Sequence, residues 1–196
     1  HAPLTRSYVY TMLQGVDKKE IFSLRNAAVV LAGHYAGGQW RMPWGGSVSP
    51  IMIPIVLFAL RWGLGRGLTA GFVFGLLQLI FDGAYAWGWQ SMLLDYLVAF
   101  TPLGLAGAFK GKNWGIFPGT VIACMSRFAV HFVSGITIYK ILVPTEVPGI
   151  GTFDDPTIYS LVYNGSYLLP SMVLVLIAAA VLYVPLKRYY AGRDIL

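Results

Sequence analysis

One acidic side chain lies in the middle of an apolar stretch of this sequence. Asp95 occupies the run QSMLLDYLVA at residues 90–99, and no basic residue lies nearby in the sequence. The segment just before it, DGAYAWGW at residues 82–89, is dense in aromatic rings. A carboxylate inside a membrane is costly unless it meets a cation, a hydrogen-bond donor or water, and aromatic faces attract organic cations. These residue types indicate a binding site for a small cationic or polar ligand.

Asp95 also has a purely structural interpretation. Arg127 and His131 lie four residues apart in the run RFAVHFVSG, so they share one face of a helix. Either side chain could pair with Asp95 and serve only to hold helices together. His131 by itself fits a ligand contact and a hydrogen-bonded core histidine equally well, and Arg127 could simply neutralise a neighbouring charge.

A second polar group lies near the start of the last apolar run. Tyr159 and Tyr163 are four residues apart and share a helical face, and Asn164 lies within about 140° of Tyr159 around the helix. An asparagine offers both donors and acceptors, which suits recognition of a heterocycle edge. The alternative is an interfacial belt, because Trp and Tyr gather at both membrane surfaces. Tyr85 and Tyr96, which flank the acid in the sequence, are further candidates for the site.

Sequence signals for enzymatic chemistry are missing. The chain has no GxxxxGKS or GxxxxGKT loop, no HExxH and no GxSxG, so it is not expected to hydrolyse ATP or to be an enzyme. Three histidines and one cysteine, Cys124, without metal-ligand spacing predict no metal site and no cofactor.

Composition places the chain in a membrane. Of its 196 residues 57% are apolar and only 11% are charged, against about 25% charged in ordinary globular proteins. The net charge is +6, but the basic residues are scattered near the ends of apolar segments, which suits membrane orientation rather than nucleic-acid binding. We expect a polar leader or surface segment over residues 1–20 and one membrane domain over residues 21–196.

The apolar runs predict an all-α bundle of six membrane helices. These cover residues 21–40, 51–62, 68–81, 90–109, 114–139 and 157–186. Pro102 and Gly104 are expected to bend the fourth helix. Segments 41–50, 63–67, 82–89, 110–113 and 140–156 are expected to be loops or turns.

Most basic residues fall at alternate connections, and therefore on one side of this bundle. Those near one set of connections are Lys18, Lys19, Arg61, Arg66, Lys110, Lys112, Lys187, Arg188 and Arg193. The positive-inside rule then predicts that both termini are cytoplasmic, and that loops 82–89 and 140–156 lie outside.

Two stripes of small residues repeat at four-residue spacing. Gly67, Gly71 and Gly75 favour close packing inside the bundle. A stripe of alanines occurs in the first predicted helix, at Ala28, Ala32 and Ala36. It fits either a docking face for a partner or, as we favour from the residues alone, packing within the bundle.

Four runs together resemble the thiamine-specific substrate-binding (S) subunit of energy-coupling-factor (ECF) transporters. They are MPWGGSVSPIMIPIVLFALRWGLGRGLTAGFVFGLLQLI, LLDYLVAFTPLGLAGAFKG, RFAVHFVSG and YSLVYNG, and the likeness extends from Met42 to the C-terminus. The resemblance implies a six-helix protein of the cell membrane that captures thiamine from outside. It also implies association with a transmembrane coupling subunit and two cytoplasmic ATPases.

The resemblance also implies roles for individual residues. The acid of the family's site, usually a glutamate, falls on Asp95, and a stacking tryptophan falls on Tyr139. The other implied thiamine contacts are Tyr85, Tyr96, His131, Gly135, Tyr159, Asn164 and a lid tryptophan at Trp44. The stripe Ala28, Ala32 and Ala36 matches the family's contact with the coupling subunit.

The chemistry of thiamine agrees with the residues. Its thiazolium ring carries a permanent positive charge that aromatic rings attract, and its aminopyrimidine suits a carboxylate and an asparagine. Two other functions stay open at this point. The chain could be an S subunit for another vitamin, or a structural membrane protein whose polar residues only join helices.

Overall fold

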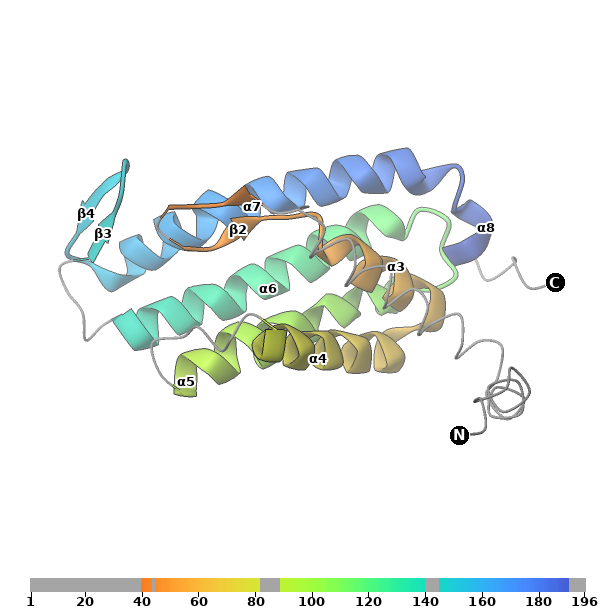
Figure 1. Cartoon of the computed structure of the whole chain (residues 1–196). Coiled ribbons are helices and arrows are strands. Elements are labelled where there is room, and N and C mark those ends of the chain that lie inside the picture. The colour runs from red at the N-terminus through yellow and green to blue at the C-terminus, as the bar shows by residue number, and fades with distance from the viewer. Residues whose placement is uncertain (1–39, 44, 82–88, 140–144, 191–196) are drawn as a thin grey trace, which may run out of the picture. The chain divides into compact units, whose positions relative to one another are not determined.

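The structure is a computed structural model that describes residues 40–43, 45–81, 89–139 and 145–190. It is mostly helical (Figure 1). The helices are α3 (Met52–Trp62), α4 (Leu64–Phe81), α5 (Trp89–Met92), η1 (Leu93–Val98), η2 (Thr101–Phe109), α6 (Ile116–Tyr139), α7 (Pro156–Tyr183) and α8 (Lys187–Tyr190). The predicted leader and nearly all of the predicted first helix lie outside the described residues.

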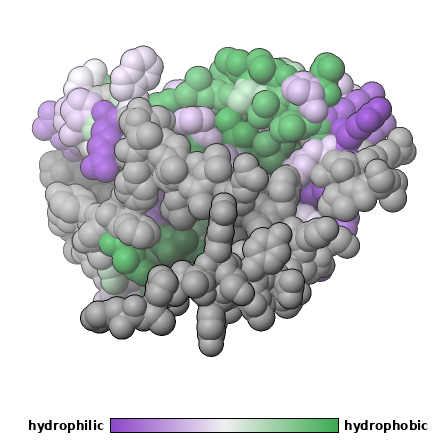
Figure 2. Space-filling model, turned by 45° about the vertical axis from the view of Figure 1, so that its right-hand side comes forward, coloured by the Kyte–Doolittle hydropathy of each residue, from purple (hydrophilic) through white to green (hydrophobic). Residues whose placement is uncertain are grey.

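Within the described residues, three helical stretches are long and apolar enough to cross a membrane. They are Trp89–Phe109, Ile116–Thr137 and Pro156–Tyr183, and two shorter apolar helices accompany them, Met52–Trp62 and Leu64–Ile80. Many large apolar side chains on these helices face outward, such as Ile80, Ile177 and Val181. Figure 2 shows an apolar region of the surface flanked on both sides by hydrophilic side chains. This is the surface expected of a chain whose helices are surrounded by lipid along the middle of their length.

The glycine stripe of α4 packs inside the bundle, as the sequence predicts. A Cβ atom at Gly71 would collide with the backbone carbonyl of Phe100, and one at Gly75 with that of Tyr96. Gly104 in turn lies against the backbone at Leu68. Because these residues lack side chains, α4 and the helix of residues 89–109 can approach with backbones in contact.

The predicted helix over residues 90–109 divides into three parts. After one turn of α-helix (α5), η1 is a π-helix, in which the amide of Ala99 donates to the carbonyl of Leu94 five residues earlier. A 3₁₀-helix, η2, follows with Pro102 in its first turn. A proline has no amide hydrogen to donate, so the regular α-helical ladder is interrupted here. The helix type therefore changes on both sides of Ala99.

The two longest helices of the described residues, α6 and α7, lie side by side (Figure 1). The start of α7 is fixed by Asp155, whose Oδ1 accepts hydrogen bonds from the amides of Thr157 at 2.6 Å and Ile158 at 3.2 Å. Pro156 follows as the first helical residue, where its missing amide hydrogen is not needed. The helix thus begins at a well-defined residue at the end opposite α8.

Two small hairpins replace parts of the predicted loops. Strands β1 (Trp40–Arg41) and β2 (Ser47–Val48) pair antiparallel, as do β3 (Thr145–Val147) and β4 (Gly151–Phe153). The first hairpin lies along α7, because the amide of Ser49 donates to Ser171 Oγ at 3.1 Å.

The predicted turn over residues 63–67 is wrong in extent. Gly63, at φ 94°, alone separates α3 from α4. Only a residue without a Cβ adopts this conformation without strain.

Candidate binding site

Asp95 and His131 come together from different helices. The Nδ1 atom of His131, on α6, lies 3.1 Å from Oδ1 of Asp95, on η1. Ser91, one turn earlier, donates from Oγ to Oδ2 of Asp95 at 2.7 Å. The His131 side chain is 9% exposed and that of Asp95 is 30% exposed. The carboxylate is therefore in contact with His131 and Ser91 while part of it stays open.

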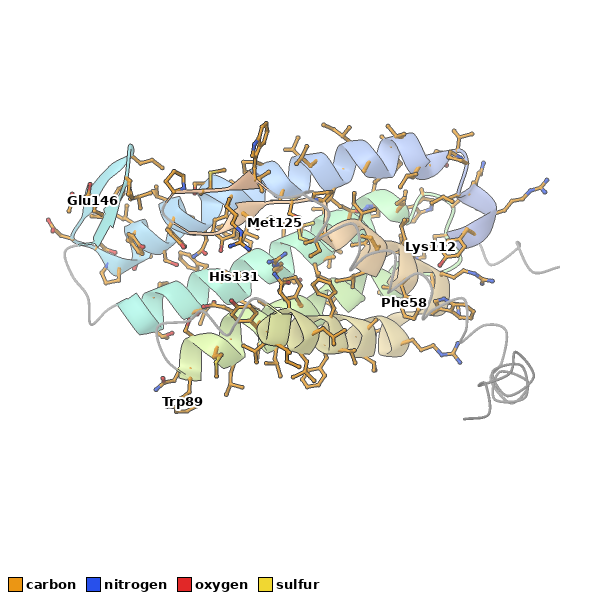
Figure 3. All side chains as sticks on the ribbon, in the orientation of Figure 1. Phe58, Trp89, Lys112, Met125, His131 and Glu146 are labelled. Carbon is orange, nitrogen blue, oxygen red and sulfur yellow. The ribbon has the colours of Figure 1, made fainter. Side chains whose placement is uncertain are left out.

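Arg127 extends this contact on the far side of the imidazole. Its Nε donates to Nε2 of His131 at 3.4 Å, and its Cζ lies 4.0 Å from the centroid of the Phe100 ring. An Nε2 atom that accepts from a guanidinium carries no hydrogen, so the hydrogen of a neutral His131 is on Nδ1, facing Asp95. The four side chains thus form one continuous hydrogen-bonded row, Ser91–Asp95–His131–Arg127. Figure 3 labels His131 on α6.

Asn164 lies behind His131 and is buried. Its Nδ2 donates to the backbone carbonyl of His131 at 3.1 Å and to that of Ser160 at 3.0 Å. Its Oδ1 accepts from the hydroxyl of Tyr167 at 2.8 Å. In this structure Asn164 therefore joins α7 to the turn of α6 that carries His131.

Three tyrosines form a row along α7, at four-residue spacing. The rings of Tyr159 and Tyr163 are stacked, with centroids 5.5 Å apart and planes at 21°. Tyr163 meets Tyr167 edge to face at 5.7 Å, and Tyr167 meets the ring of His131 in the same way at 6.3 Å. The prediction that Tyr159 and Tyr163 share a face is confirmed. The row brings aromatic surface up to His131, next to the acid.

The first hairpin covers this tyrosine row. Gly46, at φ 75°, is so close to the Tyr167 ring that a Cβ atom would lie 2.6 Å from it, and Gly45, at φ 98°, approaches the Tyr163 hydroxyl in the same way. Val48 completes a buried apolar cluster with Tyr167 and its neighbour on α7. A segment predicted only as a loop therefore forms one wall beside the candidate site.

The structure describes only some of the other residues that were predicted to form the binding site. Gly135 lies at the contact of α6 with α7, and Tyr96 is half-buried beside Asp95 on η1. Tyr139 is the last residue of α6, and its side chain is outside the described part of the chain. Tyr85, Trp44 and the stripe Ala28, Ala32 and Ala36 also lie outside it.

Three further residues of this site were missed by the sequence reasoning. Ser91 precedes Asp95 by four residues and Tyr167 follows Tyr163 by four, so helical spacing alone could have found both. Ser160 precedes Asn164 by four residues and accepts from it, so the same spacing applies, but spacing does not show that Ser160 also donates to the carbonyl of Phe132 on α6 at 2.8 Å. Within the described residues no three His, Cys, Asp or Glu side chains are placed to hold a metal ion.

Comparison with known proteins identifies the family. The family model described as thiamine transporter protein (Thia_YuaJ) matches residues 24–191. This chain belongs to the thiamine transporter family. It is 34% identical over 179 residues to the thiamine transporter ThiT of Bacillus subtilis (strain 168), an alignment that covers 85% of this chain and 90% of that protein. The thiamine transporter family is one of membrane transporters and not of enzymes.

One further relative and one solved structure are also similar to this chain. The thiamine transporter ThiT of Lacticaseibacillus paracasei is 29% identical over 200 residues, covering 90% of this chain and 94% of that protein. The solved structure of ThiT from Listeria monocytogenes has the same fold, with a TM-score of 0.69 at 22% identity. That comparison covers 89% of this chain and 99% of the solved chain.

Proposed function

We propose that this chain binds thiamine as the substrate-binding subunit of an ECF vitamin importer. The observation that carries the proposal is the contact of Asp95 with His131 beside the tyrosine row, in a chain that belongs to the thiamine transporter family. A partly open carboxylate next to aromatic rings suits a ligand with a permanent positive charge. The relatives named thiamine transporters make thiamine the first ligand to test.

The thiamine contacts proposed are those that the family resemblance implies. They are Asp95, Tyr96, Tyr85, His131, Gly135, Tyr139, Tyr159, Asn164 and Trp44. Each desolvated contact between the thiazolium and an aromatic ring would contribute about 2 kcal/mol. One charge-assisted hydrogen bond would add about 1.5–3 kcal/mol. A few such contacts suffice for tight binding if the site is formed before the ligand arrives.

The wider organisation follows from the same proposal. Residues 21–196 would form a single six-helix membrane domain after a segment at residues 1–20, with both termini in the cytoplasm. Thiamine would then enter from outside. Transport would need a transmembrane coupling subunit and two ATPases, with Ala28, Ala32 and Ala36 on the docking face.

A ligand titration tests the proposal. Purified chain in detergent is titrated with thiamine, biotin and riboflavin, and binding is followed by tryptophan fluorescence and by calorimetry. Thiamine should quench the fluorescence saturably and release or absorb heat, whereas the other two vitamins should not. Saturable binding of biotin or riboflavin, with none of thiamine, would assign the chain to a different vitamin.

A further inference from the structure

One end of the bundle carries most of the described cations. Arg66, Lys110, Lys112, Lys187 and Arg188 are exposed there, and Arg61 is buried beside them. The acids of the described residues lie elsewhere, at Asp95, Glu146, Asp154 and Asp155. Figure 3 shows this separation, with Lys112 labelled at one end and Glu146 at the other. The basic end therefore presents a positive surface with no carboxylate of the described chain within it.

Aromatic rings lie among these cations. Arg61 Cζ is 4.9 Å and Arg66 Cζ 5.5 Å from the centroid of the Trp62 ring. Lys112 Nζ is 5.3 Å from the ring of Trp114, which is 56% exposed. Trp with Lys or Arg is the combination found where a membrane helix reaches the headgroup layer. The contacts are therefore typical of an end of the bundle that lies at that layer.

The indole of Trp62 has an unusual environment. Trp62 is 9% exposed, and its Nε1 donor has no hydrogen-bond partner among the described residues. A buried donor without an acceptor is destabilising. Two guanidinium groups flank the same ring, and the Lys110 side chain packs over the adjacent Gly63, with its Cδ 3.2 Å from where a Cβ would stand. An anionic oxygen is an acceptor for the Trp62 indole N–H that these neighbouring cations would also attract.

Apolar side chains beside the same cations indicate which kind of molecule carries that anionic group. Leu64, Phe117 and Val184 are exposed at the ends of α4, α6 and α7 on this side. Such residues contact acyl chains favourably, whereas a soluble phosphate or an acidic peptide would leave them in water.

We propose that Trp62, Arg61, Arg66 and Lys110 bind the phosphodiester headgroup of an anionic phospholipid, with its acyl chains against the neighbouring apolar residues. The indole N–H and the guanidinium groups donate to the phosphate oxygens, and Lys110 contributes a further positive charge. This site is distinct from the one around Asp95 and does not depend on the nature of the transported ligand.

The amount of phospholipid that stays bound to the purified chain tests this proposal directly. The full chain is purified from mixed micelles with equal amounts of phosphatidylglycerol and phosphatidylcholine of the same acyl chains, and bound lipid is counted by native mass spectrometry. The wild type should retain phosphatidylglycerol in preference. Arg66→Gln should lower that retention about fivefold, the effect of one cation beside anionic lipid, and Arg66→Lys should restore most of it. Trp62→Phe, which keeps the ring and removes the N–H, should also lower it.

Arg41→Gln is the matched control, because it removes one exposed positive charge from the first hairpin and should leave retention unchanged. Equal retention of both lipids, or an equal loss in Arg41→Gln and Arg66→Gln, would overturn the proposal. So would displacement of phosphatidylglycerol by equimolar glycerophosphate or by a soluble glutamate oligopeptide, since the site would then belong to a free phosphate or to an acidic protein segment. Should Trp62→Phe fail to fold, the exposed Arg66 variants still decide the question.

Discussion

Gly135 on α6 lies directly against Ser160 on α7, so that a Cβ atom at Gly135 would collide with the Oγ atom of Ser160. The same Oγ donates to the carbonyl of Phe132 at 2.8 Å and accepts from Nδ2 of Asn164 at 3.1 Å. Asn164 in turn holds the backbone of His131. The absence of a side chain at Gly135 therefore allows the helix contact that places the imidazole beside Asp95.

Gly135→Ala should lower both stability and thiamine affinity. The added methyl group overpacks the contact between α6 and α7, at a cost of about 1–3 kcal/mol, and displaces Asn164. Thermal unfolding in detergent and a thiamine titration measure the two effects. Gly165→Ala on α7 is the control, because its Cβ would meet only Leu169 Cδ1 at 3.7 Å. Equal behaviour of the two variants would show that α6 and α7 are not in close contact at Gly135.

Asp95→Asn should weaken thiamine binding by roughly 10- to 150-fold while the fold is kept, since it removes one charge-assisted interaction worth about 1.5–3 kcal/mol. The asparagine has nearly the same shape and can still accept from Ser91. Fluorescence titration and a thermal melt are the measurements. Asp154→Asn, which removes the same charge from the exposed segment before α7, should bind like the wild type. Unfolding of Asp95→Asn without any specific ligand effect would favour a purely structural role for the Asp95–His131 pair.

Arg127→Gln should release the imidazole of His131 from its fixed tautomer. A glutamine is shorter than an arginine, is uncharged and can accept as well as donate, so it does not fix the hydrogen of the imidazole on one nitrogen, and the hydrogen bond to Asp95 is no longer enforced. We expect thiamine affinity to fall at least fivefold, the effect of about 1 kcal/mol from a disrupted buried hydrogen bond. Arg127→Lys should recover part of it. Nitrogen-15 NMR of labelled histidine reports the tautomer, and an unchanged spectrum in Arg127→Gln would mean that Arg127 does not set it.

Asp155→Ala should destabilise the start of α7 near neutral pH but not in strong acid. The amides of Ile158 and Thr157 hold the pKa of the Asp155 carboxyl below its ordinary value of 3.8. A carboxyl with a lowered pKa stabilises the fold fully above its ordinary pKa, and that contribution is lost as the pH falls through the lowered value. The difference in melting temperature between wild type and Asp155→Ala should therefore shrink below about pH 4. Asp154→Ala, which removes the neighbouring acid but not the cap, should leave the start of α7 as stable as in the wild type at neutral pH.

The apolar runs predicted the helical elements well, because hydrophobic length is the dominant signal in a membrane chain. α3, α6 and α7 begin and end within a few residues of the expected bounds. The packing role of Gly67, Gly71 and Gly75 was also predictable, since small residues at four-residue spacing allow backbones to meet.

Contacts between distant residues were not predictable from the sequence. Asp95 and His131 are 36 residues apart, so spacing could suggest the pair but not distinguish it from a pair with Arg127. The two hairpins escaped notice because strands of two or three residues show no alternation of apolar and polar positions. The start of α4 at Leu64 was hidden by glycines at residues 63, 65 and 67, which usually mark a turn.

The π-helix η1 has a consequence for how this family could change. Its hydrogen bonding spans five residues instead of four, so it holds one residue more than an α-helical turn. Deleting one residue from Leu93–Val98 can be absorbed by a return to α-helical bonding, so that the helix before and after this turn keeps its orientation and only the residues of the turn itself change place. Single-codon insertions and deletions here would re-aim the acid while the glycine-lined contact of η2 with α4 stays in place. Length variation at this one turn is thus a route to new ligand preferences that leaves the bundle intact.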